Sequence, residues 1–322
     1  MGIRIKINRF TVFKEFDIDF CEGINIIIGK NGVGKTHLLK MIFAMSTAMR
    51  EQINVQTDNA ETVKISPQMA QMKFESIFDT DQITAYMNIV GAKYEIFYDN
   101  DVIIKVVFVP EKEMLSHASG LLTMKKKYGS NMPFDLTLLD IIEKAQAWKL
   151  SDIPHIANEV TPSLEKVMNG TVEVRNDGSF WMKKNNGSAI PFSMEAEGPK
   201  RLGLLWQLLM NESIDKNTLL LWDEPEVSIN PENIPVLVDA MLQMQRHGVK
   251  IIMATHSYNF ARYFDILRKN SDNIQYYCLY TSDGGFTQYA KADSFAALNP
   301  NPIDDAGEKL YNDSIQKSLE DI

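Results

Sequence analysis

Gly29-Lys30-Asn31-Gly32-Val33-Gly34-Lys35-Thr36 matches the phosphate-binding loop pattern G-x-x-x-x-G-K-[ST] at every fixed position. The β-branched apolar run Ile24–Ile28 leads directly into this stretch and predicts a buried strand. The segment His37–Met45 follows with the apolar spacing of a helix and without a breaker. Strand, glycine-rich loop and helix form the context that the motif requires, so a flexible glycine turn without a ligand is the weaker interpretation.

The residue types of the loop suit the binding of a nucleoside triphosphate. Its glycines allow the backbone to approach phosphate oxygens, and the N–H groups then point inward at the positive end of the following helix. Lys35 supplies a positive charge for the β- and γ-phosphates, and the hydroxyl of Thr36 is suited to ligate Mg²⁺. We therefore expect residues 29–36 to bind ATP, with Lys35 also taking part in catalysis.

A second group of candidate site residues follows the apolar run Thr218–Trp222. Adjacent carboxylates at the end of a buried strand are costly without a partner, and Asp223 and Glu224 occupy this position. Beside the phosphate loop, we expect Asp223 to hold Mg²⁺ opposite Thr36, and Glu224 to accept a proton from the attacking water. The alternative is an exposed acidic turn after a core strand.

A histidine lies at the end of another apolar run. Residues Val249–Ser257 predict a buried strand, and His256 comes just past its apolar part. In an open parallel sheet, ligands bind beyond the carboxyl ends of the strands. We therefore expect His256 to face the same crevice as Lys35 and Asp223, rather than to be a capping or surface histidine.

Length, charge and cysteine content bound the class of protein. The 322 residues suffice for one large α/β domain or two ordinary ones. The formal net charge of −9 means that any contact with DNA would be local. The two cysteines, Cys21 and Cys278, have no metal-type spacing and fit a reducing compartment. With neither a membrane-length apolar run nor a signal-peptide core, the sequence predicts a cytoplasmic protein without membrane contact.

The remaining pattern predicts an α/β fold with a mixed sheet. Strict alternation at Ile3–Ile7 and Phe16–Phe20 predicts an antiparallel pair ahead of the phosphate loop. Asn176-Asp177-Gly178 predicts the turn of a hairpin. The strands of this hairpin are expected at Thr171–Arg175 and Ser179–Lys183. Other strands are expected at Lys73–Phe78, Lys93–Tyr98 and Val102–Val109, and helices within Pro133–Trp148, Ile156–Met168 and Gly198–Leu209. Pro154 and Pro162 limit where these helices can run.

These elements predict three consecutive parts. Residues 1–110 and 191–322 would form the two halves of a nucleotide-binding head, with an inserted, mostly helical lobe and its hairpin at residues 111–190. The basic run Lys125-Lys126-Lys127 in the lobe is either a solvated face or a contact for DNA or an acidic partner. About 65 residues follow His256 and predict a strand pair and a helix at Asp305–Leu319, too little for another catalytic domain of ordinary size.

Four segments in this order resemble the ABC-type ATPase heads, which have the P-loop NTPase fold. The resemblance is to their soluble prokaryotic branch, related to SMC, RecF and the ATPase part of the OLD nucleases and often labelled AAA-family ATPases. It covers residues 1–55 and 190–290 well, and the middle of the chain weakly. The segments are Gly29–Thr36, Leu219–Glu224, Ser228-Ile229-Asn230-Pro231 and Ala254-Thr255-His256-Ser257.

The resemblance implies roles for particular residues. Residues 228–231, with Asn230, match the loop that meets its twin across a dimer, and His256 matches the histidine that senses the γ-phosphate. The signature motif, which caps the ATP of the opposite subunit, matches Glu195–Leu202, with Gly198 facing the nucleotide. Where the family has a serine and a small residue before this glycine, this chain has Ala196 and Glu197. The glutamine that couples Mg²⁺ to the lobe has three candidates, namely Gln68, Gln71 and Gln82.

The resemblance also implies a function. Two heads would pack head to tail around ATP and Mg²⁺ as a homodimer or higher homo-oligomer, and hydrolysis would release them. Since no nuclease domain is expected in this chain, the effector would be a separate nuclease or toxin, in anti-phage defence or DNA maintenance. The alternatives are a nucleotide-gated scaffold with little turnover and, less favoured, the cassette of a membrane transporter.

Overall fold

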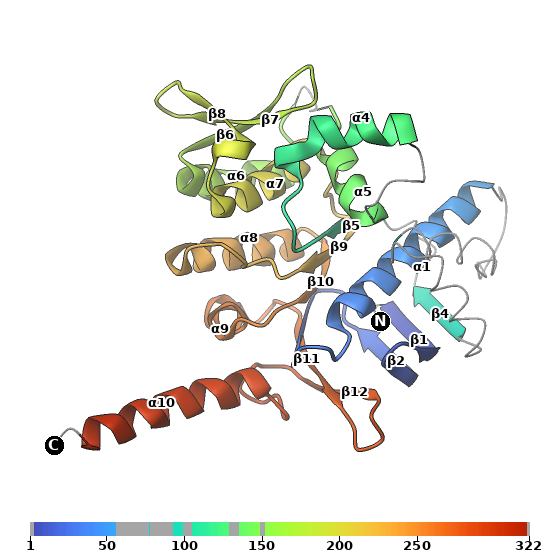
Figure 1. Cartoon of the computed structure of the whole chain (residues 1–322), viewed down its shortest axis with the longest axis vertical. Helices are drawn as coiled ribbons and strands as arrows, with labels where there is room; N and C mark the ends of the chain where they lie inside the picture. The colour runs from blue at the N-terminus through green and yellow to red at the C-terminus, as the bar shows by residue number, and fades with distance from the viewer. Residues whose placement is uncertain are drawn as a thin grey trace.

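The computed structural model describes residues 3–55, 77, 93–98, 105–128, 135–148 and 152–320. Its centre is a six-stranded sheet in the order β12–β11–β3–β10–β9–β5 (Figure 1). Neighbouring strands are parallel except β12, which is antiparallel to β11. Their bounds are β3 (Ile24–Gly29), β5 (Lys105–Val109), β9 (Thr218–Asp223), β10 (Lys250–Ala254), β11 (Ile274–Thr281) and β12 (Thr287–Ala292). The predicted α/β class with a mixed sheet is confirmed, and the carboxyl ends of the parallel strands meet at one edge.

A second, antiparallel sheet has the order β2–β1–β4. It is formed by β1 (Ile3–Phe10), β2 (Phe13–Phe20) and β4 (Lys93–Tyr98). Alternate residues of β1 and β2 are buried, as the strict alternation of the sequence requires. The predicted antiparallel pair is therefore confirmed, and β4 adds a third strand beside β1.

Helix α1 (Lys35–Val55) joins the two sheets. Its side chains Leu38 and Ile42 are fully buried in one apolar cluster with the inner faces of β1 and β2 and one face of the central sheet. In β3, Ile27 belongs to this cluster, whereas Ile26 belongs to the cluster on the opposite face. Because successive strand residues point to opposite faces, the strand that leads into the phosphate loop is fixed from both sides.

The opposite face of the sheet is covered by α7 (Glu197–Met210), α8 (Ile234–Arg246) and α9 (Tyr258–Leu267) (Figure 1). The segment predicted as the lobe, residues 111–190, contains a 3₁₀ turn at Leu115–His117 and the helices α4 (Ala118–Tyr128), α5 (Leu136–Ala145) and α6 (His155–Met168), and a second 3₁₀ turn at Phe192–Met194 follows it. Buried side chains of α5 and α6 lie in the same apolar cluster as those of α7 and α8. The segment predicted to be a separate lobe therefore shares one apolar core with the rest of the chain, and the division into three parts stays a prediction.

The predicted hairpin is confirmed by β6 (Gly170–Val174) and β7 (Phe180–Lys184), and β8 (Ala189–Pro191) adds a third antiparallel strand. Pro154 precedes α6 as expected. The limit expected at Pro162 is wrong, since α6 continues through it to Met168. A proline inside a helix removes one backbone hydrogen bond, and the buried apolar face of α6 on both sides of Pro162 offsets this loss.

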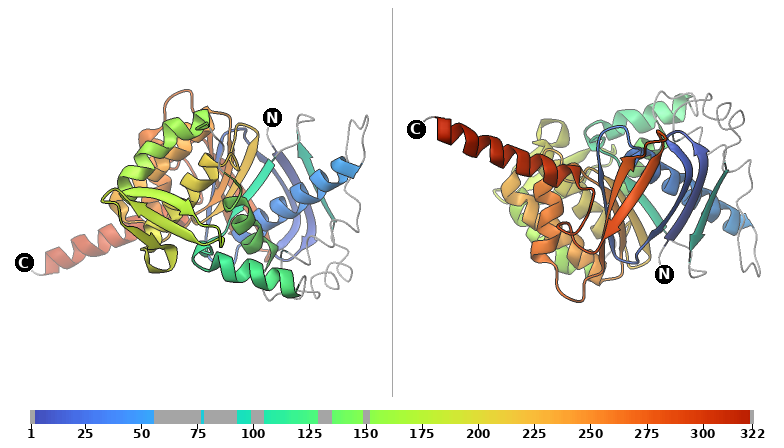
Figure 2. Two further views of the ribbon diagram at one scale, coloured as in Figure 1. Left: turned by 90° about the horizontal axis from the view of Figure 1, so that it is seen from above. Right: turned by 90° about the horizontal axis from the view of Figure 1, so that it is seen from below.

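Helix α10 (Pro302–Glu320) begins three residues before the predicted Asp305 and extends away from the rest of the chain (Figures 1 and 2). Among the described helices, none combines the length and apolarity needed to cross a membrane. The candidate glutamines 68, 71 and 82 lie outside the described residues. Of the strand expected at residues 73–78 only Ile77 is described, and it is helical rather than extended.

Candidate nucleotide site

The phosphate loop connects β3 to α1 at the carboxyl edge of the central sheet. Gly29, Gly32 and Gly34 have φ values of 148°, 80° and 97°, a region that favours glycine. A Cβ on Gly34 would lie 2.8 Å from Cζ of Phe13, so the loop is fixed against β2. The structure thus gives residues 29–34 the concave backbone that the sequence predicts.

The Lys35 side chain lies back over this loop. Its Nζ donates to the backbone oxygens of Gly29 at 2.9 Å and Lys30 at 3.1 Å, and the residue is only 7% exposed. Burial lowers its pKa to about 8, and the carboxylates of Glu224 and Asp223 oppose this shift. A buried ammonium group held by neutral carbonyls would be strongly stabilised by a phosphate anion.

The hydroxyl of Thr36 and the carboxylate of Asp223 meet across the crevice. Thr36 Oγ1 donates to Asp223 Oδ2 at 2.8 Å, and Asp223 is 5% exposed at the end of β9. Burial raises the pKa of Asp223, and the neighbouring carboxylates of Glu224 and Glu111 add to this effect. A hydroxyl and a buried carboxylate are oxygen ligands of the kind that Mg²⁺ prefers, so the two residues fit the predicted metal site.

Glu224 and His256 lie side by side at the same edge. The Oε1 atom of Glu224 is 3.4 Å from Nε2 of His256. Glu224 has a φ of 48°, a left-handed conformation that is strained for a non-glycine residue and is fixed by its N–H donating to the oxygen of Ala254 at 2.9 Å. Burial raises the pKa of Glu224 and lowers that of His256, and the Lys35 charge acts in the same direction on the histidine. The structure therefore brings Lys35, Asp223, Glu224 and His256 together, as expected.

Two family descriptions match the chain in overlapping segments. Residues 4–130 match "AAA domain", and residues 120–262 match "AAA domain, putative AbiEii toxin, Type IV TA system". An SMC head bound to the C-winged helix domain of ScpA has a similar structure, with a TM-score of 0.50 at 12% identity over 91% of this chain and 98% of that chain. The chain has the P-loop NTPase fold of the ABC and SMC ATPase heads.

Curated relatives match a smaller part of this chain. The glutamate transport ATP-binding protein GluA of Corynebacterium glutamicum is 26% identical over 111 residues, or 34% of this chain and 40% of GluA. The DNA replication and repair protein RecF of Oenococcus oeni is 37% identical over 54 residues, or 17% of this chain and 14% of RecF. The chain thus spans well under two thirds of the curated relatives that it matches. The resemblance to SMC, RecF and ABC-type heads is confirmed.

Three charged residues of the head's crevice were not singled out from the sequence. Arg201 on α7 is 6% exposed and donates through Nη1 to the backbone oxygen of Glu224 at 3.3 Å and through Nη2 to that of Glu111. Glu111 follows β5, whose carboxyl end lies next to that of β9. The sequence signal for Arg201 was weak, namely a cation on the apolar face of a helix. Glu111 gave no signal because its position depends on the strand order.

The third residue is Glu226, which is 9% exposed just after the carboxylate pair. The Thr255 hydroxyl donates to its Oε1, and its Oε2 has no hydrogen-bond partner within the described part of the chain. Burial raises the pKa of Glu226 to about 7. Since Thr255 immediately precedes His256, this contact fixes the backbone that presents the histidine to the crevice. An acidic residue two positions after the adjacent pair was the signal that could have identified it.

The two residues expected to act across a dimer lie apart from the loop. Gly198 is buried in the first turn of α7, where a Cβ would lie 2.9 Å from the backbone oxygen of Ser228. Asn230 accepts a hydrogen bond from the Glu232 N–H at 3.3 Å and caps the 3₁₀ turn Pro231–Asn233. Gly198 is thus covered by the segment before α8, whereas Asn230 in that segment is exposed. Their contact with nucleotide stays a prediction.

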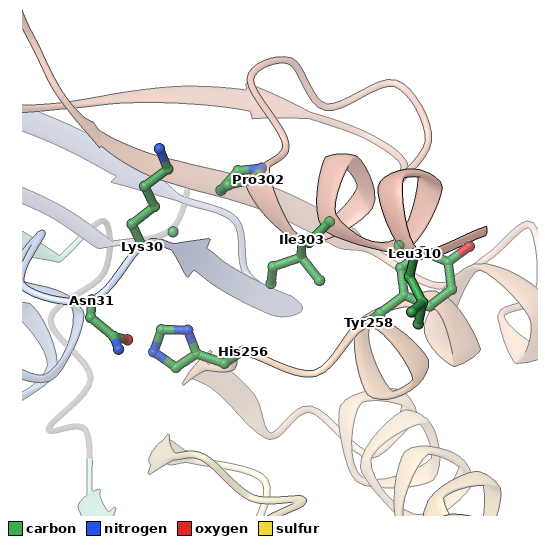
Figure 3. Close-up of a pocket in the computed structure, with 10 residues that line it drawn as sticks. Lys30, Asn31, His256, Tyr258, Pro302, Ile303 and Leu310 are labelled. Atoms are coloured by element: carbon green, nitrogen blue, oxygen red, sulfur yellow. The ribbon is translucent and has the colours of Figure 1, made fainter. Parts of the chain in front are cut away.

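A cavity of about 480 Å³ borders the outer side of the phosphate loop (Figure 3). Lys30, Asn31 and His256 line one side of it, and Ile303 and Leu310 of α10 line the other (Figure 3). The side chains of Lys30 and Asn31 therefore border a space that a larger ligand or a second protein surface could enter.

Proposed function

We propose that this head binds ATP with Mg²⁺, hydrolyses it, and thereby switches between separate and paired states. The observation that supports this is the single crevice shared by the Lys35 ammonium, the Thr36–Asp223 pair and the Glu224–His256 pair. Phosphoryl transfer to water depends on positioning and on charge stabilisation, and these groups supply a cation, oxygen ligands and a base.

In this proposal the loop N–H groups and Lys35 hold the β- and γ-phosphates. Thr36 and Asp223 hold Mg²⁺, which would neutralise charge that develops on the phosphate oxygens. Binding of the cation also offsets the burial of the Asp223 carboxylate, because this carboxylate has no cation of its own within hydrogen-bond distance in the described residues.

Glu224 is the proposed base. Its raised pKa makes the carboxylate a better proton acceptor than an exposed glutamate, and its side chain is 23% exposed, so water reaches it. The lowered pKa of His256 keeps its imidazole neutral near pH 7, so it acts as a hydrogen-bond partner for the γ-phosphate rather than as a cation.

The paired state is proposed from the surface around α7. Asn230 is exposed, and the adjacent segment at Ser228 covers the buried Gly198, so this part of the surface could meet the nucleotide of a second copy. The SMC head of similar fold is described as bound to a domain of ScpA, and one matched family description refers to a toxin system. We extend these to a separate effector, a nuclease or toxin, for a cytoplasmic switch in anti-phage defence or DNA maintenance.

DNA is a weaker proposal, as a local contact. Of the basic run on α4, Lys125 already pairs with Glu143 at 2.6 Å, which lowers its availability for phosphates. Salt-dependent DNA binding that persists after Lys125–Lys127 are changed to alanine would exclude this run as the contact.

The second candidate function is a nucleotide-gated scaffold with little turnover. The observation that favours it is the exposed start of α7, where Ala196 lacks a hydroxyl and Glu197 places a negative charge where a phosphate would bind. The relatives named as transport ATP-binding proteins keep the transporter cassette as a third candidate. Co-purification with a membrane subunit would favour it.

The variant Glu224→Gln tests hydrolysis. It removes the proposed base and keeps the size of the side chain, so ATP binding should be retained while phosphate release falls at least about a hundredfold. Because ATP then persists, the dimer fraction in sedimentation should rise in the presence of ATP and Mg²⁺. Glu15→Gln, an exposed carboxylate on β2, is the control and should leave both measurements unchanged.

Steady-state phosphate release separates the candidates. Turnover in the wild type that Glu224→Gln abolishes supports the switch. Tight ATP binding with release at the background rate supports the scaffold, and unchanged turnover in Glu224→Gln removes Glu224 as the base.

A further inference from the structure

We propose that His155, Glu159 and His247 form a binding site for one transition-metal ion of the zinc type, which joins α6 to the end of α8. The site stands independently of ATP, since none of its residues takes part in the nucleotide crevice. It is carried by the geometry of the three side chains and by the chemistry of their donor atoms.

The three ligand atoms converge from two helices. His155 and Glu159 are one turn apart on α6 and therefore lie on the same face, and His247 immediately follows α8. The Nε2 atom of His247 is 2.9 Å from Oε2 of Glu159, and Nδ1 of His155 is 3.7 Å from Oε1 of the same carboxylate. One donor atom of each residue lies within 4.8 Å of the other two.

These distances suit a small tetrahedral ion. With metal–ligand bonds of about 2.1 Å, tetrahedral geometry places ligand atoms about 3.4 Å apart. The two imidazole nitrogens lie 2.9 and 3.7 Å from the two different oxygens of Glu159, and one donor atom of each residue lies within 4.8 Å of the other two. Rotation of the three side chains would have to bring these atoms to the tetrahedral spacing when an ion binds.

The backbones that carry the ligands are fixed. At the start of α6, the Asn158 N–H donates to the oxygen of Pro154 at 2.9 Å. At the end of α8, the His247 N–H donates to the oxygens of Gln243 and Met244, each at 3.1 Å. Both helices belong to one buried apolar cluster. The backbone at each ligand position is therefore fixed before any ion binds, so binding has to order only the side chains.

A simple hydrogen bond explains only part of this arrangement. The contact between His247 and Glu159 would serve as an ordinary surface pair. It does not account for His155, whose Nδ1 is beyond hydrogen-bond distance from the carboxylate and whose ring packs edge-on against that of His247, with centroids 5.2 Å apart. Two imidazoles directed at one carboxylate are the arrangement that a metal ion would use.

The donor set also decides which ion is suitable. Two imidazole nitrogens and one carboxylate favour Zn²⁺, Co²⁺, Ni²⁺ or Cu²⁺ over Mg²⁺ and Ca²⁺, which prefer oxygen. The His155 side chain is 81% exposed and that of Glu159 49%, which leaves a fourth position open to water.

The consequence would be a link between lobe and head. α6 belongs to the inserted lobe, and α8 directly follows the segment Ser228–Pro231 that is expected at the dimer surface. An ion that joins their ends would restrict movement of the lobe relative to this segment.

Calorimetric titration of the metal-stripped full chain with Zn²⁺ alone tests the proposal. Millimolar Mg²⁺ is kept in the buffer so that oxygen sites near Asp223 do not compete. We expect one Zn²⁺ per chain, with affinity at least tenfold weaker in His155→Asn, His247→Asn and Glu159→Gln. His117→Asn, an exposed histidine on the 3₁₀ turn before α4, is the matched control and should bind as the wild type does.

Thermal unfolding gives a second readout. Zn²⁺ should raise the unfolding temperature of the wild type and of His117→Asn, but not that of the three site variants, because an ion bound only to the folded state stabilises it. No Zn²⁺ binding by the wild type, or equal binding by His155→Asn and His247→Asn, would overturn the proposal. Two of the three side chains are exposed and that of His247 is 24% exposed. Loss of Zn²⁺ binding in a variant whose unfolding temperature without metal is unchanged is therefore not a folding defect.

Discussion

Two helices of this head begin with a glycine close to a site that is expected to meet phosphate, and they differ in almost every other respect. Before α1, Gly34 has a φ of 97°, the helix has no acidic residue in its first turn, and Lys35 supplies a cation. Before α7, Ala196 makes no side-chain cap, and Glu197 places an acid in the first turn, paired with Lys200 at 2.8 Å.

The difference shows that a helix N-terminus alone does not make an anion site. Both helices have the partial positive charge of the macrodipole. At α1 this charge is directed into a concave glycine loop with a buried ammonium group. At α7 it is already compensated by Glu197, and Gly198 is covered by the Ser228 backbone. The N-terminus of α1 can thus bind phosphate within a single chain, whereas the N-terminus of α7 would need a second copy to bring the phosphate to it.

The largest expected effect is that of Lys35→Ala. It removes the buried cation at the α1 site, and ATP affinity measured by calorimetry should fall about a thousandfold or more, since buried charge pairs of this kind contribute several kcal/mol. Lys166→Ala, an exposed lysine on α6, should bind ATP as the wild type does. ATP binding by Lys35→Ala within tenfold of the wild type would contradict the assignment of the α1 site.

The next largest effect is expected for Arg201→Met, which removes the side chain that connects α7 to the crevice. The change leaves the backbone oxygens of Glu111 and Glu224 without their guanidinium donor and removes a cation from a group of carboxylates. We expect the free energy of unfolding in urea to fall by about 3 kcal/mol. Arg262→Met, at a partly exposed position on α9, should change it by less than about 0.5 kcal/mol. Equal effects of the two variants would show that Arg201 does not anchor α7.

The glycine pair tests the comparison directly. In Gly34→Ala a side chain must adopt a φ near 97° against the Phe13 ring, which costs about 1–3 kcal/mol and should weaken ATP binding about tenfold. In Gly198→Ala the added Cβ meets Ser228 instead, so ATP binding by the single chain should weaken by less than about threefold. A stronger effect of Gly198→Ala on ATP binding would show that the two helix starts are not distinct.

The smallest effect is expected when the N-terminus of α7 is made a better anion site, as the N-terminus of α1 is. Ala196→Ser with Glu197→Gln restores a hydroxyl and removes the acid, which changes the interaction with an anion by about 0.3–1 kcal/mol. The ATP-dependent dimer fraction in sedimentation should then rise about twofold to fivefold. The single variant Ala196→Gly, which restores no hydroxyl, is the control. An unchanged or lower dimer fraction would mean that α7 does not face a phosphate.

How much of the site could be predicted depended on how local its chemistry is. The loop at Gly29–Thr36 and the carboxylates Asp223 and Glu224 were found because each is a short contiguous pattern next to an apolar strand. His256 was found because a parallel sheet collects the ends of its strands at one edge. The strand predicted at Lys73–Phe78 is wrong at Ile77, which is helical. Over so few residues, the spacing of apolar side chains does not distinguish a strand from a helix.

Local patterns in the sequence were enough to predict the α/β class, the phosphate loop and the residues suited to bind a nucleotide and Mg²⁺. Only the tertiary structure decided that Glu111 and Arg201 border Glu224, because this depends on β5 pairing with β9 and on α7 packing beside them. It likewise brought His155 and His247 together from positions far apart in the chain. Contacts between distant segments depend on strand order and helix packing, which no short stretch of sequence specifies.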